Sequence, residues 1–139
     1  MNKQIILELK DLNDLESVAT QIIEHISYSR ILFIGELGAG KTTLIKEIMK
    51  QMGCTDQGSS PSYSIINQYE AKDDPMYHID LYRMETPEET FTLGIEEILY
   101  SGHYCFIEWP QVIMDYIYDD YHVLQIDIIE NNNRKIRFS

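Results

Sequence analysis

Apolar residues along the chain fall into short runs and helix-like patterns that alternate. RILFI at 30–34 is the most continuous run, and such runs are typical of a strand buried on both faces of a parallel sheet. TTLIKEIMKQM at 42–52 instead carries apolar residues at helical spacing and is followed by Gly53, a common helix stop. The segment between them therefore joins a buried strand to a helix.

Further elements are predicted on both sides of this unit. Strands are expected at IILEL near residue 5, YSIINQY (63–69), MYHIDLYR (76–83) and HYCFIEWP (103–110), and YHVLQIDII with RKIRF should form a β-hairpin around NNN (131–133). A helix is expected between Asn13 and Ser29, where Asn13 and Glu16 are spaced like a capping box, and a short one near Thr86. The pattern predicts one α/β domain over residues 1–139, with a mixed, mostly parallel sheet flanked by helices and a C-terminal β-hairpin.

The segment GELGAGKT at 35–42 follows the phosphate-loop (Walker A) spacing G-x-x-x-x-G-K-[ST]. Glycines let backbone N–H groups turn inward toward phosphates, and the next helix adds the positive end of its dipole. Lys41 can reach the β- and γ-phosphates, and the Thr42 hydroxyl can bind Mg²⁺. Chance gives this pattern in about one chain in a few hundred, but the strand–loop–helix order favours a true P-loop. The residues predicted to bind ATP here are Leu37, Gly38, Ala39, Gly40, Lys41, Thr42 and Thr43.

Two acidic residues end apolar strands: Asp80 in MYHID and Glu108 in YCFIE. Nucleotide hydrolysis needs one carboxylate to hold Mg²⁺ and another to orient water. The carboxyl ends of parallel strands meet at one edge of a sheet, so both acids could face Lys41. A strand-terminal acid alone is more often a capping or surface residue, but beside a phosphate loop these two are the best candidates. Trp109 and Pro110 are expected only to turn the chain and cover the sheet.

Charge is distributed unevenly over the chain, whose net charge is −12. Residues 70–130 carry 15 acidic and 2 basic side chains, whereas residues 1–69 carry 8 and 6. A protein that binds nucleic acid by itself needs a basic face, so direct tRNA binding is disfavoured. The acidic half is either a solvated surface, which is the commoner case, or a docking face for a basic partner.

The sequence argues against a membrane protein, a secreted protein and a protein with a disulfide or a cysteine metal site. Neither a membrane-spanning apolar stretch nor a signal peptide is recognisable, so a cytoplasmic protein without membrane contact is expected. Cys54 and Cys105 are far apart and lack metal-ligand spacing, which favours free or buried thiols. The histidines are scattered along the chain.

Several blocks resemble, in order and spacing, the signatures of the TsaE (YjeE) family: LGAGKTT (37–43), SPSY (60–63), HIDLYR (78–83), LGIEE (93–97) and IEWP (107–110). The resemblance extends from the helix near Leu15 to the hairpin near Arg134. It implies an Mg²⁺-dependent ATPase that acts with TsaB- and TsaD-like subunits of a tRNA threonylcarbamoyl-transferase complex. Its product would be N6-threonylcarbamoyladenosine (t6A) at position 37 of tRNAs that read ANN codons.

The resemblance also implies roles for single residues. Thr42 and Glu108 would bind Mg²⁺, Asp80 would lie near the γ-phosphate, and Lys41, Asp80 and Glu108 would form the catalytic set. Ser62 stands where the family usually has Thr, and its hydroxyl preserves a switch role near the γ-phosphate. Arg134 and Lys135 would lie over the adenine, whereas Leu15 replaces a Thr that would hydrogen-bond near this base.

Three other functions are alternatives to an ATPase. A GTPase should carry an NKxD-type guanine-reading segment, which the sequence lacks. A small-molecule kinase usually needs an Arg-rich lid, but the only arginines are Arg30, Arg83, Arg134 and Arg137. A nucleotide-dependent docking or scaffold module with negligible turnover stays open, because slow hydrolysis and scaffold behaviour can share one sequence.

Overall fold

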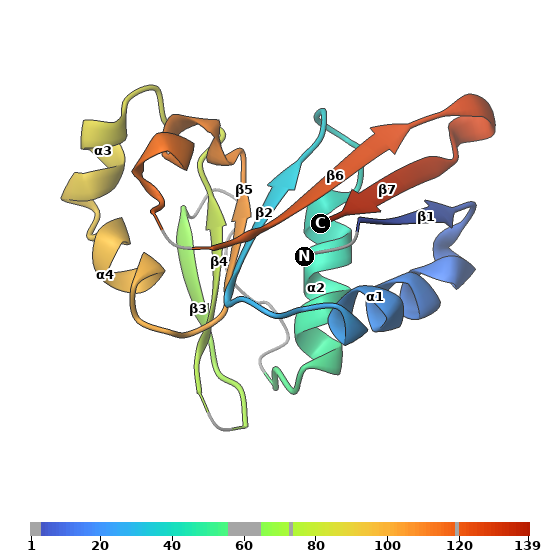
Figure 1. Ribbon diagram of the computed structural model, residues 1–139, viewed down its shortest axis with the longest axis horizontal. Coiled ribbons are helices and arrows are strands. Elements are labelled where there is room, and N and C mark those ends of the chain that lie inside the picture. The colour runs from blue at the N-terminus through green and yellow to red at the C-terminus, as the bar shows by residue number, and fades with distance from the viewer. Residues whose placement is uncertain (1–3, 56–64, 73, 119) are drawn as a thin grey trace.

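The computed structural model describes residues 4–55, 65–72, 74–118 and 120–139. Within these residues one sheet has the strand order β1-β7-β6-β2-β5-β4-β3 (Figure 1). The strands are β1 (Ile5–Leu9), β2 (Arg30–Ile34), β3 (Ile66–Tyr69), β4 (Met76–Asp80), β5 (Cys105–Glu108), β6 (His122–Ile128) and β7 (Arg134–Phe138). The helices are α1 (Leu15–Glu24), α2 (Lys41–Gln51), α3 (Pro87–Thr92) and α4 (Ile95–Leu99), with 3-10 turns at Leu12–Asp14, Pro110–Val112, Met114–Tyr116 and Glu130–Asn132.

The sheet is mixed, as predicted. Its central strands β6, β2, β5 and β4 run parallel, while β3 on one side and β7 and β1 on the other pair antiparallel. The predicted C-terminal hairpin is β6–β7, and its turn places Asn131 and Asn132 at φ 59° and 61°. Asn tolerates this left-handed conformation better than most residues. Three consecutive Asn residues therefore suit the turn that the sequence predicts here.

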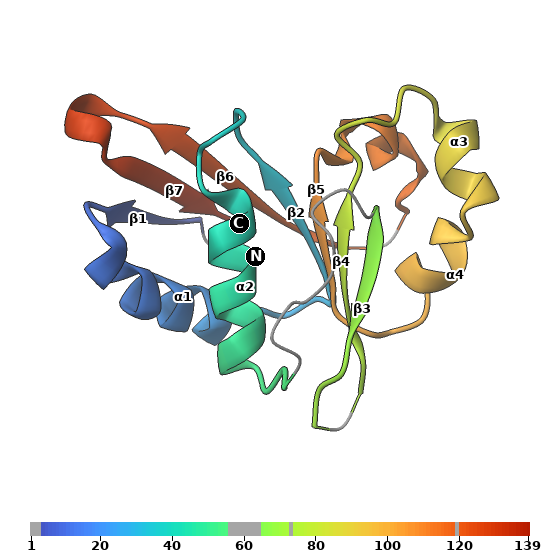
Figure 2. The same cartoon turned by 180° about the vertical axis from the view of Figure 1, so that it is seen from behind.

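Helices cover both faces of the sheet. Alternate residues of β2 enter different cores, because successive side chains of a strand point to opposite faces. Ile31 and Phe33 pack in the core that contains α1 and α2, whereas Leu32 packs in the core that contains α4. Figure 2 shows α1 and α2 on the side of β1 and β2, and α3 and α4 beyond β5 and β4. No helix in the described part of the chain is long and apolar enough to cross a membrane.

The first helix differs from its prediction at both ends. The capping box lies at Asp11 and Asp14, not at Asn13 and Glu16, and it caps the 3-10 turn that precedes α1. The Asp11 side chain accepts a hydrogen bond from the Asn13 backbone N–H at 2.7 Å. α1 then ends at Glu24, well before the predicted limit of Ser29.

The second helical segment also needs correction. Thr86 begins it as predicted, because its hydroxyl accepts a hydrogen bond from the Glu89 backbone N–H and the Glu89 carboxylate accepts one from the Thr86 N–H. The segment is not one helix, however, but the pair α3 and α4. Gly94 separates them at φ 79°, a conformation open to glycine that a continuous helix cannot contain.

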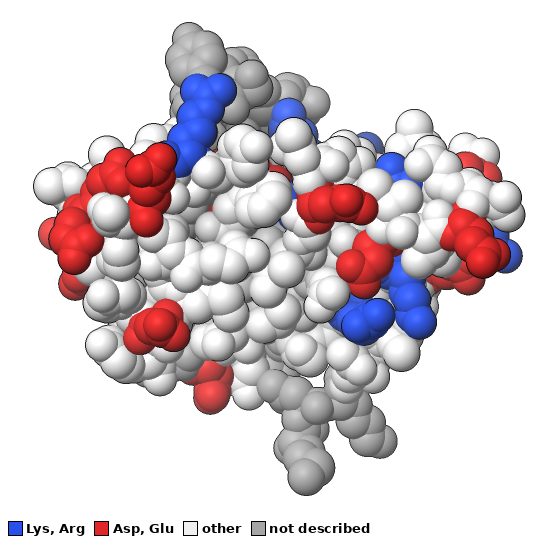
Figure 3. Space-filling view, turned by 90° about the horizontal axis from the view of Figure 1, so that it is seen from above, with Lys and Arg blue, Asp and Glu red and all other residues white. Residues whose placement is uncertain are grey.

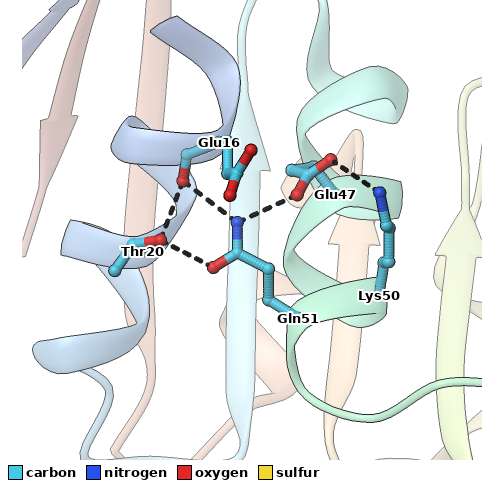
Figure 4. Close-up of polar contacts among 5 residues, drawn as sticks. All are labelled: Glu16, Thr20, Glu47, Lys50 and Gln51. Carbon is cyan, nitrogen blue, oxygen red and sulfur yellow. Dashed lines mark hydrogen bonds and ion pairs between the residues drawn. The ribbon is translucent and has the colours of Figure 1, made fainter.

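A hydrogen-bond network joins α1 to the C-terminal end of α2 (Figure 4). The Gln51 amide donates to the Glu16 carbonyl oxygen at 3.0 Å and to the Glu47 carboxylate at 2.9 Å. Its oxygen accepts from the Thr20 hydroxyl at 2.8 Å. These contacts hold the two helices of one layer together and so support the helix that follows the phosphate loop.

Neither Cys54 nor Cys105 is in a disulfide, as predicted. Cys105 is fully buried in β5, and burial raises the pKa of its thiol to about 12, while the charge of Arg30 acts in the opposite direction. The thiol therefore stays protonated and unreactive.

His122 explains why α1 stops where it does. Its Nε2 accepts hydrogen bonds from the backbone N–H groups of Ser27 (2.8 Å) and Tyr28 (3.1 Å), and its Nδ1–H donates to the Ser139 carbonyl oxygen (3.0 Å). This long-range contact provides the N–H groups after α1 with an acceptor outside the helix. The imidazole must be neutral to accept at Nε2. Burial lowers its pKa, with the hydrogen bond to Ser139 opposing.

We expect this histidine to make the protein sensitive to mild acid. The unfolded chain takes up the proton near pH 6.5, whereas the folded chain resists it, so the free energy of unfolding should fall as the pH drops below about 6.5. The loss should reach up to about 1.4 kcal/mol per pH unit until the folded pKa is passed. Denaturant unfolding between pH 7.5 and 5 measures it. These pH values lie above the range in which ordinary carboxylates titrate.

A His122→Gln variant should lose this acid dependence, and its free energy of unfolding at pH 7.5 should be lower by about 1–3 kcal/mol. His25 is the matched control, because it is exposed at the end of α1. The account is wrong if His25→Gln removes the dependence and His122→Gln retains it.

Candidate active site

The predicted phosphate loop connects β2 to α2, as expected. Gly38 and Gly40 have φ values of 82° and 103°, and Gly40 is the residue that caps the start of α2. These positions need glycine because other residues rarely adopt such angles. At Gly35 the reason is space, since a Cβ atom there would lie 2.7 Å from the Ile126 backbone oxygen. The loop glycines thus serve two different purposes, backbone conformation and close approach to β6.

A cavity of about 320 Å³ lies where α2 begins and β4 and β5 end. β4 and β5 are parallel neighbours in which Asp80 stands opposite Glu108. The structure therefore brings together all three predicted catalytic residues and Thr42. The full lining is Leu37, Gly38, Gly40, Lys41, Thr42, Thr43, Asp80, Tyr82, Glu108 and Trp109.

Glu108 accepts two hydrogen bonds on the same oxygen. The Thr42 hydroxyl donates to Oε2 at 2.7 Å, and Nε2 of His78 lies 2.6 Å from Oε2. Because an ionised carboxylate can only accept, the His78 Nε2–H is the donor. Burial alone would raise the pKa of Glu108, but the hydrogen bonds from His78 and Thr42 and the charge of Lys41 outweigh it, and the pKa is lowered. Glu108 is therefore a carboxylate at neutral pH.

Asp80 ends β4 through a hydrogen bond to the backbone two residues later. Its Oδ1 accepts a hydrogen bond from the Tyr82 backbone N–H at 3.0 Å, an Asx turn that stops the strand. The predicted strand continued to Arg83 and is therefore too long. Burial raises the pKa of Asp80, and the nearby charge of Glu108 adds to this, while the hydrogen bond from Tyr82 opposes it. The two site carboxylates thus have pKa values shifted in opposite directions, as is common in catalytic pairs.

Lys41 is folded back onto its own loop. Its ammonium donates to the Gly35 carbonyl oxygen and lies 3.5 Å from the centre of the Trp109 ring, a cation–π contact. Burial lowers the pKa of Lys41, and the charges of Glu108 and Asp80 partly offset this. Both of these partners of the lysine are uncharged groups at the edge of the cavity.

A second cavity of about 670 Å³ adjoins the first, and Gly38, Gly40 and Thr43 line both. It is bounded by residues 9–13, Leu15, Asn132 and Arg134. Arg134 donates from Nε to the Ala39 carbonyl oxygen at 2.9 Å, so its guanidinium also supports the phosphate loop. Of the residues that the resemblance linked to adenine, Leu15 and Arg134 therefore line this space beside the loop, whereas Lys135 does not.

A family model described as "Threonylcarbamoyl adenosine biosynthesis protein TsaE" matches residues 9–136. This chain belongs to the TsaE family. It is similar to the tRNA threonylcarbamoyladenosine biosynthesis protein TsaE of Rickettsia conorii, with 37% identity over 75% of this chain and 59% of the relative. The protein of that name from Bacillus subtilis is 34% identical over 76% of this chain and 65% of the relative. The resemblance seen in the sequence blocks is confirmed.

Solved structures support the same family. The crystal structure of Bacillus subtilis YdiB matches with a TM-score of 0.78 and 25% identity, over 99% of this chain and 86% of that one. The predicted P-loop fold class is thereby confirmed. The chain spans only 59% and 61% of the length of the first two Rickettsia relatives.

Two residues of this TsaE-family site have roles that the sequence patterns do not predict. Trp109 does turn the chain, at φ 55°, but its ring also contacts Lys41 and lies 4.9 Å from that of Tyr82. The prediction that it only covers the sheet is therefore wrong. His78 was counted among scattered histidines. Its position two residues before Asp80, on the same face of one strand, is the signal that could have identified it.

The side-chain oxygens that could act as metal ligands in this TsaE-family site suit Mg²⁺. Among the described residues, no group of three or more His, Cys, Asp and Glu side chains could hold a metal. Mg²⁺ usually needs no such group, since it binds proteins through one or two carboxylates and completes its shell with water and phosphates. Thr42 donates its proton to Glu108, so the lone pairs of its oxygen remain for an ion. The predicted switch residue Ser62 lies outside the described residues.

Proposed function

We propose that this chain binds ATP with Mg²⁺ at the phosphate loop and hydrolyses it in the formation of t6A in tRNA. The observation that carries the proposal is the meeting of Lys41, Thr42, Asp80 and Glu108 in one cavity at the start of α2. The relatives are named tRNA threonylcarbamoyladenosine biosynthesis proteins, which supports this pathway. The specific product proposed is t6A at position 37 of tRNAs that read ANN codons.

The two adjoining cavities suggest how the nucleotide lies. The phosphates occupy the smaller one, where loop N–H groups and the positive end of α2 favour anions. The base occupies the larger one, which shares Gly38, Gly40 and Thr43 with it. Leu15 contributes an apolar surface there, and Arg134 a cation held on the loop.

Each polar residue of the site has a distinct task in hydrolysis. Lys41 leaves the Gly35 carbonyl and the Trp109 ring and moves onto the β- and γ-phosphates. Thr42 and Glu108 hold Mg²⁺, which when bound neutralises charge on the phosphates. Asp80 lines the same cavity and orients the attacking water through its carboxylate oxygens.

The arginines disfavour a phosphoryl-transfer kinase. Arg30 donates to the carbonyl oxygens of Leu99 and Asp120, and Arg134 to that of Ala39. Arg137 lies 3.6 Å from Asp127. In the described part of the chain, Lys41 is the single cationic residue that lines the phosphate cavity. With a single cation at the phosphates, the isolated chain is expected to hydrolyse ATP slowly, and partner subunits are expected to complete the site.

We propose that these partners are TsaB- and TsaD-like proteins that meet the acidic face of the chain. Figure 3 shows acidic side chains spread over one face of the molecule, with fewer basic ones between them. Glu88 and Glu89 on α3 and Glu96 and Glu97 on α4 are all exposed. Such a surface attracts a basic partner and repels a phosphate backbone.

The isolated chain is accordingly expected to show no appreciable affinity for tRNA at physiological salt. Its basic residues are either in the site, like Lys41, or dispersed, and tRNA binding needs several on one face. A mobility-shift titration with purified tRNA measures this. Tight binding that weakens steeply with added salt would contradict the partner-mediated proposal.

A nucleotide-dependent pull-down of the TsaB- and TsaD-like proteins tests the acidic face itself. Reversal of charge at Glu88, Glu96 and Glu97 to Lys should weaken capture; Glu89 is left unchanged because its carboxylate caps α3. Glu24→Lys is the matched control, because Glu24 is exposed at the end of α1. ATP turnover with and without the captured proteins then separates an ATPase from a docking module with negligible turnover.

A further inference from the structure

His78 is a buried polar residue that the proposed chemistry does not use. It lies in β4, has an exposed fraction of 6%, and does not line the phosphate cavity. A polar side chain buried in a strand is unfavourable unless it is hydrogen-bonded. The hydrogen bond that satisfies this one goes to Glu108, on the neighbouring strand β5, over 2.6 Å. The contact therefore couples a buried histidine to a residue assigned to the metal.

The hydrogen bond from His78 helps to fix the orientation of the Glu108 carboxylate. The terminal torsion of a Glu side chain is soft, so a carboxylate without fixed partners rotates. Here Thr42 and His78 both donate to Oε2. Among the described residues no donor contacts Oε1, which leaves that oxygen for water or an ion. Two donors on one oxygen thus set which edge of the carboxylate is offered to the cavity.

The same arrangement orients the Thr42 hydroxyl. Its proton is directed to Glu108 only while Oε2 stays at 2.7 Å from it. With the proton so directed, the lone pairs of the Thr42 oxygen remain for a cation. Loss of the His78 hydrogen bond would release the carboxylate, and the hydroxyl would lose its fixed direction with it.

We propose that His78 is a positioning residue: its Nε2–H holds Oε2 of Glu108, and thereby presents Glu108 Oε1 and the Thr42 oxygen to Mg²⁺. His78 touches neither metal nor nucleotide and acts only through Glu108. The inference rests on the proposed Mg²⁺–ATP site. Partners that orient metal ligands typically contribute about 10- to 100-fold to metal affinity.

The test uses variants that separate the hydrogen bond from the volume of the side chain. His78→Phe keeps a buried ring but removes the donor. His78→Gln keeps an amide N–H at the distance of Nε2, whereas the shorter His78→Asn does not reach Glu108. His103→Gln is the matched control, because His103 packs against Tyr77 outside the phosphate cavity.

Two binding titrations on the full chain give the readout. Trp109 is the only tryptophan of the chain and lies on Lys41, so its fluorescence can report ATP binding. ATP is titrated first in EDTA and then at increasing Mg²⁺, and Mn²⁺ affinity is measured by electron paramagnetic resonance. Thermal unfolding of each variant shows whether it is folded.

We expect His78→Phe to bind ATP in EDTA like the parent, while the Mg²⁺ and Mn²⁺ concentrations for half-saturation rise about 10- to 100-fold. His78→Asn should behave like His78→Phe, and His78→Gln should regain most of the parental metal affinity. If His78→Phe does not fold, the difference in metal affinity between His78→Gln and His78→Asn is sufficient to decide.

Parental metal affinity in a folded His78→Phe or His78→Asn protein would overturn the inference. So would an equal loss of ATP affinity in EDTA and in Mg²⁺, which indicates a purely structural role. If the parent binds ATP but Mg²⁺ has no effect on it, the proposed metal site itself fails, and this inference fails with it.

Discussion

Lys41→Ala is expected to reduce ATP hydrolysis to background and to weaken ATP binding. Within the described residues no other basic side chain lines the phosphate cavity. Removal of one group that stabilises transition-state charge typically slows a reaction by about 10²- to 10³-fold, and a lysine charge on the β- and γ-phosphates should be worth at least that. Phosphate release in the presence of partner proteins measures the effect.

Lys46→Ala is the matched control, since Lys46 is exposed on the same helix. It should leave hydrolysis unchanged. If Lys41→Ala binds and hydrolyses ATP like the parent, the phosphate-loop assignment is wrong.

Asp80→Asn and Glu108→Gln are expected to fail in different ways. Glu108→Gln should raise the Mg²⁺ concentration needed for half-maximal activity, because an amide is a poor magnesium ligand and its NH₂ group cannot accept from Thr42 and His78. Asp80→Asn should leave binding of ATP with Mg²⁺ largely intact but slow turnover by about 10²-fold or more, as expected for an interaction made mainly in the transition state.

Titration of Mg²⁺ at saturating ATP distinguishes the two carboxylates. Glu24→Gln, at the exposed end of α1, serves as the control and should match the parent in both respects. A reversed pattern, with the metal defect in Asp80→Asn, would show that the two roles are exchanged.

Local patterns predicted the parts of the fold that local interactions determine. The unit of β2, loop and α2 follows from a buried apolar run, glycines with positive φ and helical spacing, all within residues 30–52. Thr86 could be identified as a helix start because a capping box involves residues only three positions apart. The order of the central strands placed Asp80 and Glu108 on one edge for a general reason, since both end parallel strands.

Some predictions failed at local features, such as the Asp11–Asp14 cap and the helix break at Gly94, and others failed where distant residues decide. α1 ends early because His122, nearly a hundred residues away, accepts the N–H groups of Ser27 and Tyr28. The role of Trp109 depends on its contact with Lys41 at the start of α2. The role of His78 depends on its hydrogen bond to Glu108 on the neighbouring strand. Such contacts leave no periodic pattern in the sequence. They are found only when the strands are placed side by side.

The central claim is that the cavity at the phosphate loop binds ATP with Mg²⁺, and calorimetric titration of ATP into the purified chain tests it most directly. We predict one ATP per chain, tighter binding with Mg²⁺ than in EDTA, and loss of binding in Lys41→Ala but not in Lys46→Ala. No detectable binding at millimolar ATP, or equal binding by the parent and Lys41→Ala, would contradict the account.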